Sequence, residues 1–104
     1  MSVNVNSLIS DMIGAAGKEA QSEGANVLGY IQTVFENERE TLKALSDARL
    51  AGEINDAEFN QELEREKFVL EGELLTARIM SKAGIQRAVN AAMGVLQKTI
   101  QSVL

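Results

Sequence analysis

The chain of 104 residues contains no cysteine, no histidine, no proline and no tryptophan. Without cysteine it can form neither a disulfide nor a thiolate nucleophile. Without histidine it lacks the commonest general base and the commonest transition-metal ligand, so its serine and threonine hydroxyls have no imidazole to activate them. We therefore expect a protein that is not an enzyme and that needs no cofactor.

The absence of proline favours long helices, because proline removes a helical hydrogen bond and clashes with the preceding turn. Aromatic residues make up only 4% of the chain, which is little for a mixed α and β core. Alanine, leucine and charged residues dominate the middle of the chain, a composition typical of helices. These features predict an all-α fold, and the length predicts a single domain over residues 1–104.

Negative charge is concentrated in the middle of the chain. Residues 36–73 carry 12 acidic and five basic side chains, a net of −7, whereas the other residues carry three acidic and five basic ones, a net of +2. The total of −5 argues against nucleic acid as a partner. The N-terminus lacks a basic region ahead of an apolar run, and no stretch approaches the ~18 apolar residues that span a membrane. We expect a cytoplasmic protein, with export by a specialised system left open.

A tight corner near the middle of the chain is predicted by signals that end one helix and begin another. Gly52 suits the position just past a helix end, where the left-handed backbone favours glycine. Asn55 fits the N-cap of the next helix, and Glu58 can reach back to its amide in a capping box. Ile54 and Phe59 are spaced as a hydrophobic staple around this cap.

Two long helices are expected to meet at this corner, one over residues 7–50 and one over residues 56–102, joined by a turn over residues 51–55. The first contains Gly24, where a break would give a version with three helices. Apolar residues repeat at alternating spacings of three and four along both helices, which predicts two heptad seams. The seam residues are Leu28, Ile31, Phe35, Leu42, Leu45, Phe59, Leu63, Leu70, Leu74 and Ala77.

The two seams match each other rung by rung. In an antiparallel pair of helices, residues at the same level have numbers with a constant sum. Leu42 with Leu63 and Phe35 with Leu70 both give 105. Seams identified separately therefore share one register, which predicts a long antiparallel helical hairpin.

Apolar side chains outside the seams point to self-association. One hairpin buries a single stripe of each helix, which is marginal for a chain of this length. Left exposed, the additional residues would form a larger apolar patch than soluble monomers usually show. A second copy would cover them in a dimeric four-helix bundle, and a different protein partner would serve equally well. These interface residues are Val27, Val34, Phe68, Leu75 and Ile79.

Glu38 and Glu66 fall at the same level of the two seams. Facing carboxylates are unfavourable unless something neutralises them. An all-oxygen metal site would suit Ca²⁺, Mg²⁺ or Mn²⁺, although metal-binding bundles also use histidine, which is absent. We expect instead that both carboxylates lie at the seam edge and pair with Arg39, Arg65 or Lys67, or with an arginine of a second copy.

We predict a non-enzymatic, homo-oligomeric helical hairpin that acts as an adaptor, a chaperone or a component of a larger assembly. A membrane-active protein is the alternative, because residues 83–104 are amphipathic and residues 1–17 carry a single charged side chain. A carboxylate metal-binding bundle is the third hypothesis.

Overall fold

All the regular structure of the described residues is helical, which confirms the prediction of an all-α chain. The computed structural model of the chain describes residues 4–24 and 26–104. The elements are α1 (Val5–Glu19), the 3₁₀ turn η1 (Gln21–Glu23), α2 (Val27–Asn37), α3 (Arg39–Leu50), α4 (Asp56–Ala77) and α5 (Lys82–Val103).

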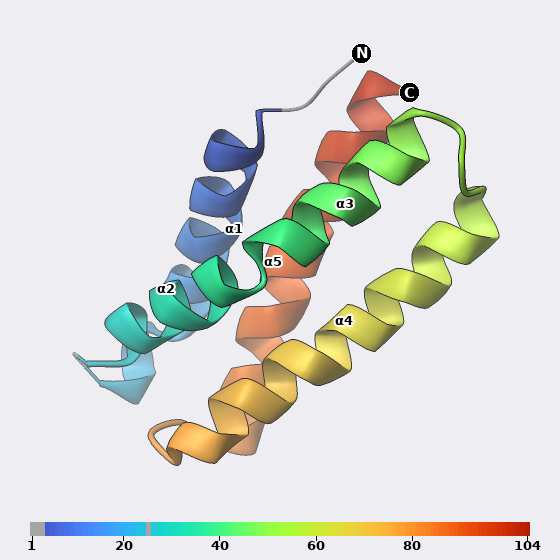
Figure 1. The fold of residues 1–104 in the computed structure, drawn as a ribbon. Helices are drawn as coiled ribbons and strands as arrows, with labels where there is room; N and C mark the ends of the chain where they lie inside the picture. Colours follow the sequence, from blue (N-terminus) through green and yellow to red (C-terminus); the bar gives the residue numbers. More distant parts are fainter. Residues whose placement is uncertain (1–3, 25) are drawn as a thin grey trace.

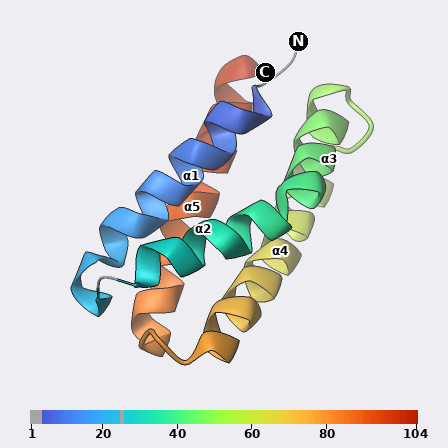
Figure 2. The same ribbon diagram turned by 60° about the vertical axis from the view of Figure 1, so that its left-hand side comes forward.

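The helices lie side by side and alternate in direction, as Figure 1 and Figure 2 show. In Figure 1, α1 runs downward, α2 and α3 return upward, α4 runs downward again, and α5 returns upward beside α1. The molecule measures 40 × 23 × 19 Å. An uninterrupted helix over residues 7–50 would be roughly 65 Å long, so the chain is folded back more often than a single hairpin requires.

The helix predicted over residues 7–50 is divided into α1, α2 and α3, so the prediction of one continuous helix is wrong. The first interruption contains Gly24, whose φ of 123° lies in the region that favours glycine. This is the break that the sequence left open. The second interruption is Glu38, a single residue between α2 and α3 with φ of −98° and ψ of 8°. α2 and α3 therefore form one bent rod (Figure 1).

The helix predicted over residues 56–102 is also interrupted, which is a second correction. α4 ends at Ala77 because Arg78 takes a left-handed conformation with φ of 57°. Ser81 then acts as the N-cap of α5, its side chain accepting a hydrogen bond of 3.0 Å from the amide of Gly84. A serine side chain that accepts a hydrogen bond from the amide three residues later is an ordinary N-cap. Here the helix begins at this cap, although the helical spacing of apolar residues continues through the segment.

Folding back buries the apolar faces of α1 and α5 against each other (Figure 1). Fully buried side chains include Ile9 and Met12 on α1 and Leu96 and Ile100 on α5. The amphipathic segment that suggested membrane contact therefore uses its apolar face inside the chain.

The two interhelical connections at the lower end of the molecule are tied together by Glu23. Its carboxylate accepts hydrogen bonds from the amide and the hydroxyl of Ser81, at 2.6 and 2.7 Å. These bonds lower the pKa of Glu23 below its ordinary value, because they favour the ionised carboxylate. The contact fixes the segment before α2 against the segment before α5.

The predicted seam residues lie largely in the core, with Leu28 as the exception. Leu28 is 51% exposed, and its side chain lies against α1, where a Cβ placed on Gly17 would approach it to 2.7 Å. The break before α2 brings α1 into this position, so Leu28 does not face α4 as predicted. The seam residues that are buried are Ile31, Phe35, Leu42, Phe59, Leu63, Leu70 and Leu74, and Leu45 and Ala77 are half-buried.

Val27 and Val34 are buried inside the chain, each only 3% exposed. The prediction that they belong to an oligomer interface is therefore wrong. A hairpin of two helices leaves these side chains uncovered. Here other helices of the same chain, α1 among them, pack against α2. They bury side chains that a second copy was expected to bury.

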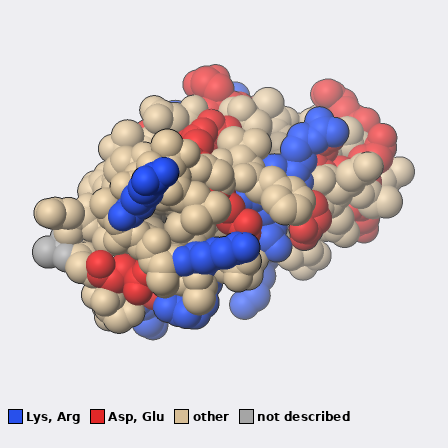
Figure 3. All heavy atoms as spheres, turned by 90° about the horizontal axis from the view of Figure 1, so that it is seen from below, with Lys and Arg blue, Asp and Glu red and all other residues tan. Residues whose placement is uncertain are grey.

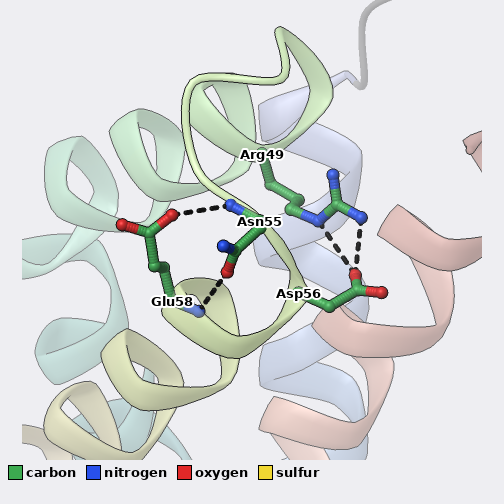
Figure 4. A network of polar contacts seen from close by, with 4 residues as sticks. All are labelled: Arg49, Asn55, Asp56 and Glu58. Atoms are coloured by element: carbon green, nitrogen blue, oxygen red, sulfur yellow. Dashed lines mark hydrogen bonds and ion pairs between the residues drawn. The ribbon is translucent and has the colours of Figure 1, made fainter.

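The corner between α3 and α4 contains the capping box expected from the sequence (Figure 4). The side chain of Asn55 accepts a hydrogen bond from the amide of Glu58 at 2.9 Å, and the amide of Asn55 donates to the Glu58 carboxylate at 3.0 Å. Gly52 has φ of 77°, and Ile54 packs against the core. The sequence therefore specifies this corner locally, through satisfied helix-end amides.

Arg49 adds a longer connection across the same corner. Its guanidinium donates hydrogen bonds from Nε and Nη2 to Oδ1 of Asp56, at 3.1 and 2.5 Å (Figure 4). The last turn of α3 is thereby joined to the first turn of α4. The positions also suit the helix dipoles, because a cation lies at the carboxyl end of α3 and an anion at the amino end of α4.

Candidate functional site

Apolar side chains are exposed along the outer face of α4 and just beyond its end. Phe68 is 73% exposed, Leu75 44% and Ile79 39%. Together with the exposed residues Arg65 and Gly72 they form a row with spacings of three, four, three and four. We call these five residues the α4 stripe. Arg65, Phe68, Gly72 and Leu75 follow one side of α4, as in a coiled-coil seam, and Ile79 lies just beyond the end of the helix.

The α4 stripe lies opposite the face of α4 that packs on the core. The buried face carries Phe59, Leu63, Leu70 and Leu74, and these positions are on the other side of a helix with 3.6 residues per turn. The exposed apolar side chains are therefore not part of the core of this chain. The prediction that Phe68, Leu75 and Ile79 contact a second copy stays a prediction, and their exposure leaves them free to do so.

A buried carboxyl group is the second unusual feature. Glu66 is only 5% exposed, and its Oε1 atom is buried with no conventional hydrogen-bond donor among the described residues. Glu38, at the kink between α2 and α3, is the neighbouring carboxyl group with the largest effect on the pKa of Glu66. Glu73 on α4 belongs to the same cluster, because Glu38 also affects its pKa. The sequence predicted that Glu38 and Glu66 lie at the same level of the two helices, and the structure places them as neighbours.

The environment of the cluster favours protonated carboxyl groups. Burial, together with a hydrogen bond to the Glu38 carboxyl and repulsion from Glu38, Glu73 and Glu62, raises the pKa of Glu66 to about 8. Burial and the hydrogen bond with Glu38 also raise the pKa of Glu73. Near neutral pH this cluster therefore holds a proton in place of a counter-charge.

Arg39, Arg65 and Lys67 pair with other acids, so the predicted pairing of these three bases with the cluster is wrong. The alternative pairing with an arginine of a second copy stays a prediction. Arg39 pairs with Glu36 at 2.9 Å, and its Nη1 also donates to the Asn6 side chain. Arg65 lies 3.7 Å from Glu62, and Lys67 lies 3.5 Å from Glu64. The Glu36–Arg39 pair spans the kink between α2 and α3, and the other two pairs lie within α4. All three join residues three positions apart and are at least partly exposed, an arrangement worth little to stability.

A groove of about 530 Å³ runs between α3 and α4 beside the carboxyl cluster. Ala44, Leu45 and Ala48 form its α3 side, and Glu62 and Glu66 lie on its α4 side. Because Glu66 lines this groove, its proton can exchange with the solvent. Over residues 4–24 and 26–104, no group of three acidic side chains is placed to hold a metal ion.

On the face seen in Figure 3, acidic and basic side chains are interspersed. None of the helices in the described part of the chain has the length and apolarity needed to cross a bilayer.

Comparison of the chain with protein-family models, with curated proteins and with solved structures finds no match. The functional argument therefore depends on the geometry of the chain itself.

Sequence reasoning identified three members of the α4 stripe and missed the other two. Arg65 and Gly72 complete the row, and their spacing from Phe68, of three and four residues, is the signal that reveals them. They were overlooked because neither side chain is apolar.

Proposed function

We propose that the protein is a non-enzymatic helical interaction protein that works as a homo-oligomer, in the role of an adaptor, a chaperone or a structural component of a larger assembly. The observation that carries this proposal is the α4 stripe, in which Phe68 is 73% exposed on a well-formed helix. Exposed apolar rows rimmed by charged residues mark protein interaction surfaces.

The energetic reason for association is the burial of apolar area. Removing an exposed phenylalanine or leucine side chain from water contributes roughly 1.5–3 kcal/mol. Phe68 and Leu75 lie on one side of α4 and Ile79 lies just beyond its end, so a single helical partner can cover Phe68 and Leu75 together. Two copies of one stripe supply the same chemistry on both sides of an interface, which is the arrangement of two-fold homodimers.

The experiment is sedimentation equilibrium of the wild type and two variants over a wide concentration range. We expect the wild type to associate to twice the monomer mass and Phe68→Glu to shift towards the monomer, because a charge cannot be buried there without a partner. Leu104→Glu is the matched control, since Leu104 is exposed but lies at the end of α5, away from the stripe. It should associate like the wild type.

A wild type that stays monomeric at every concentration would overturn the homo-oligomer. Equal association of the wild type and Phe68→Glu would show that the α4 stripe is not the contact surface.

A further inference from the structure

We propose that the groove between α3 and α4 binds an alkylammonium ion, with the charged end of the ligand at Glu66 and its hydrocarbon chain along the α3 side. Glu66 carries the inference. The residue is 5% exposed and lines the groove, and its Oε1 atom has no hydrogen-bond donor among the described residues. A buried carboxyl group in the wall of a groove, with one oxygen unpartnered, suits a ligand that supplies the missing donor.

An ammonium group offers both things that Glu66 lacks, a hydrogen-bond donor and a positive charge. An ionised carboxylate only accepts hydrogen bonds, and the neighbouring acidic residues Glu38 and Glu73 offer no positive charge. The three bases expected to pair with the cluster contact other acids. An ammonium ion has three N–H donors and no acceptor, so it complements a set of carboxylates.

The groove has an apolar part and an acidic part, which together suit an amphipathic cation. Its volume of about 530 Å³ lies within the range of small-ligand sites. Glu62 already lies 3.7 Å from Arg65, so the more buried Glu66 is the acid that a ligand charge would serve. The apolar lining residues are Ala44, Leu45, Ala48 and Ile54, and the acidic ones are Glu40, Glu62 and Glu66.

The groove suits an organic cation better than a metal ion or an anion. Ca²⁺ takes about six to eight oxygen ligands, and in the part of the chain that the structure describes no three acidic side chains are grouped to hold a metal. The acids repel an anionic head group. A neutral alcohol can cover the apolar wall but brings no counter-charge for Glu66.

Binding should depend on pH, because the ligand takes the place of a proton. The charged groups around Glu66 are Glu38 at the kink, Glu40 on α3, and Glu62 and Glu73 on α4. Burial and the contact with Glu38 raise the pKa of Glu66 to about 8. Alkylammonium ions stay charged to about pH 10, so the affinity should increase about tenfold between pH 7 and pH 9, as Glu66 ionises.

The experiment is a titration of the whole chain with n-hexylammonium chloride, followed by the methyl NMR signals of Ala44, Leu45 and Ala48. We expect these signals to shift and saturate. The neutral ligand 1-hexanol, which has the same chain length, should bind at least about tenfold more weakly, because it lacks the charge. Glu66→Gln should weaken hexylammonium binding by a similar factor. Glu64→Gln, at an exposed acid on the same helix, is the control and should bind like the wild type.

The ligand and pH comparisons use the wild type, so they do not depend on how the variants fold. Absence of a saturable shift with hexylammonium would overturn the inference. Equal affinities for hexylammonium and 1-hexanol, or an affinity that is the same at pH 7 and pH 9, would show a general apolar surface and would also overturn it. None of the described residues that line this groove belongs to the α4 stripe, so the inference goes beyond the proposed homo-oligomer and is tested separately from it.

Discussion

At the scale of single residues, Glu66 connects folding to pH. In the unfolded chain a glutamate has a pKa of about 4.3, whereas burial and the Glu38 contact raise the pKa of Glu66 to about 8 in the fold. The folded state therefore binds more protons than the unfolded state between these values. The contribution of Glu66 to stability is fully present below the unfolded pKa and is lost as the pH rises to the folded pKa.

We expect Glu66→Gln to remove most of this pH dependence. The amide is neutral at every pH, so the variant should be more stable than the wild type at pH 9, by about 1–2 kcal/mol after allowing for screening through the groove. At pH 4 the two should differ little. Urea unfolding at a series of pH values measures this, with Glu64→Gln, an exposed acid on the same helix, as the control.

If the free energy of unfolding changes with pH in the same way for the wild type and Glu66→Gln, the pKa of Glu66 is not raised in the fold. The Glu38, Glu62 and Glu73 carboxyls that face Glu66 would then not favour its protonated form. Those three groups are the ionisable neighbours that raise the Glu66 pKa. A residual slope in the variant is expected from Glu73, whose pKa is also raised.

At the scale of helices, the corner between α3 and α4 could be predicted, and the break at Gly24 was one of two alternatives. The breaks at Glu38 and Arg78 could not be predicted. The corner is specified by adjacent residues, from Gly52 to the Asn55 capping box, so local sequence suffices. The break before α5 depends on Arg78 adopting a left-handed conformation, which nothing in the local sequence requires. It is favoured by the burial of α1 against α5, which is a property of the whole fold.

Phe35 of the predicted seam and Phe68 of the α4 stripe provide a prediction at the same scale. Phe35 on α2 is fully buried and Phe68 on α4 is 73% exposed. We expect Phe35→Ala to lower the free energy of unfolding by about 3–5 kcal/mol, through lost contacts and a cavity. Phe68→Ala should change it by less than about 0.5 kcal/mol at concentrations where the chain is monomeric.

Chemical denaturation at low protein concentration measures both variants. Equal losses would mean that α2 does not pack on the core through Phe35, and the assignment of the α4 stripe to the outer surface would then be wrong as well.

At the scale of the whole molecule, the sequence predicted more of the site than of the fold. The pairing of Glu38 with Glu66 and the surplus apolar residues of α4 follow from periodicity alone. Val27 and Val34 were misassigned because periodicity shows which face is apolar and does not show which element covers it. The helices that cover them belong to the same chain, and only the tertiary fold reveals this.

Association through the α4 stripe has a thermal consequence for the whole molecule. Because a dimer is favoured by mass action, the melting temperature of the wild type should rise with protein concentration. The melting temperature of Phe68→Glu should stay nearly constant, and that of Leu104→Glu should follow the wild type. Differential scanning fluorimetry with an external dye, over a hundredfold range of concentration, makes the comparison. A wild-type melting temperature independent of concentration would contradict the dimer.

The contact between Tyr30 and α4 equips the protein with its own optical reporter. Tyr30 is the single tyrosine of a chain without tryptophan, and its hydroxyl donates a hydrogen bond of 3.4 Å to the backbone carbonyl of Glu73. The near-ultraviolet emission of the unlabelled protein therefore comes from one phenol between two helices. Separation of α2 from α4 should change its intensity, whereas fraying at the far end of the α3–α4 corner should leave it steady.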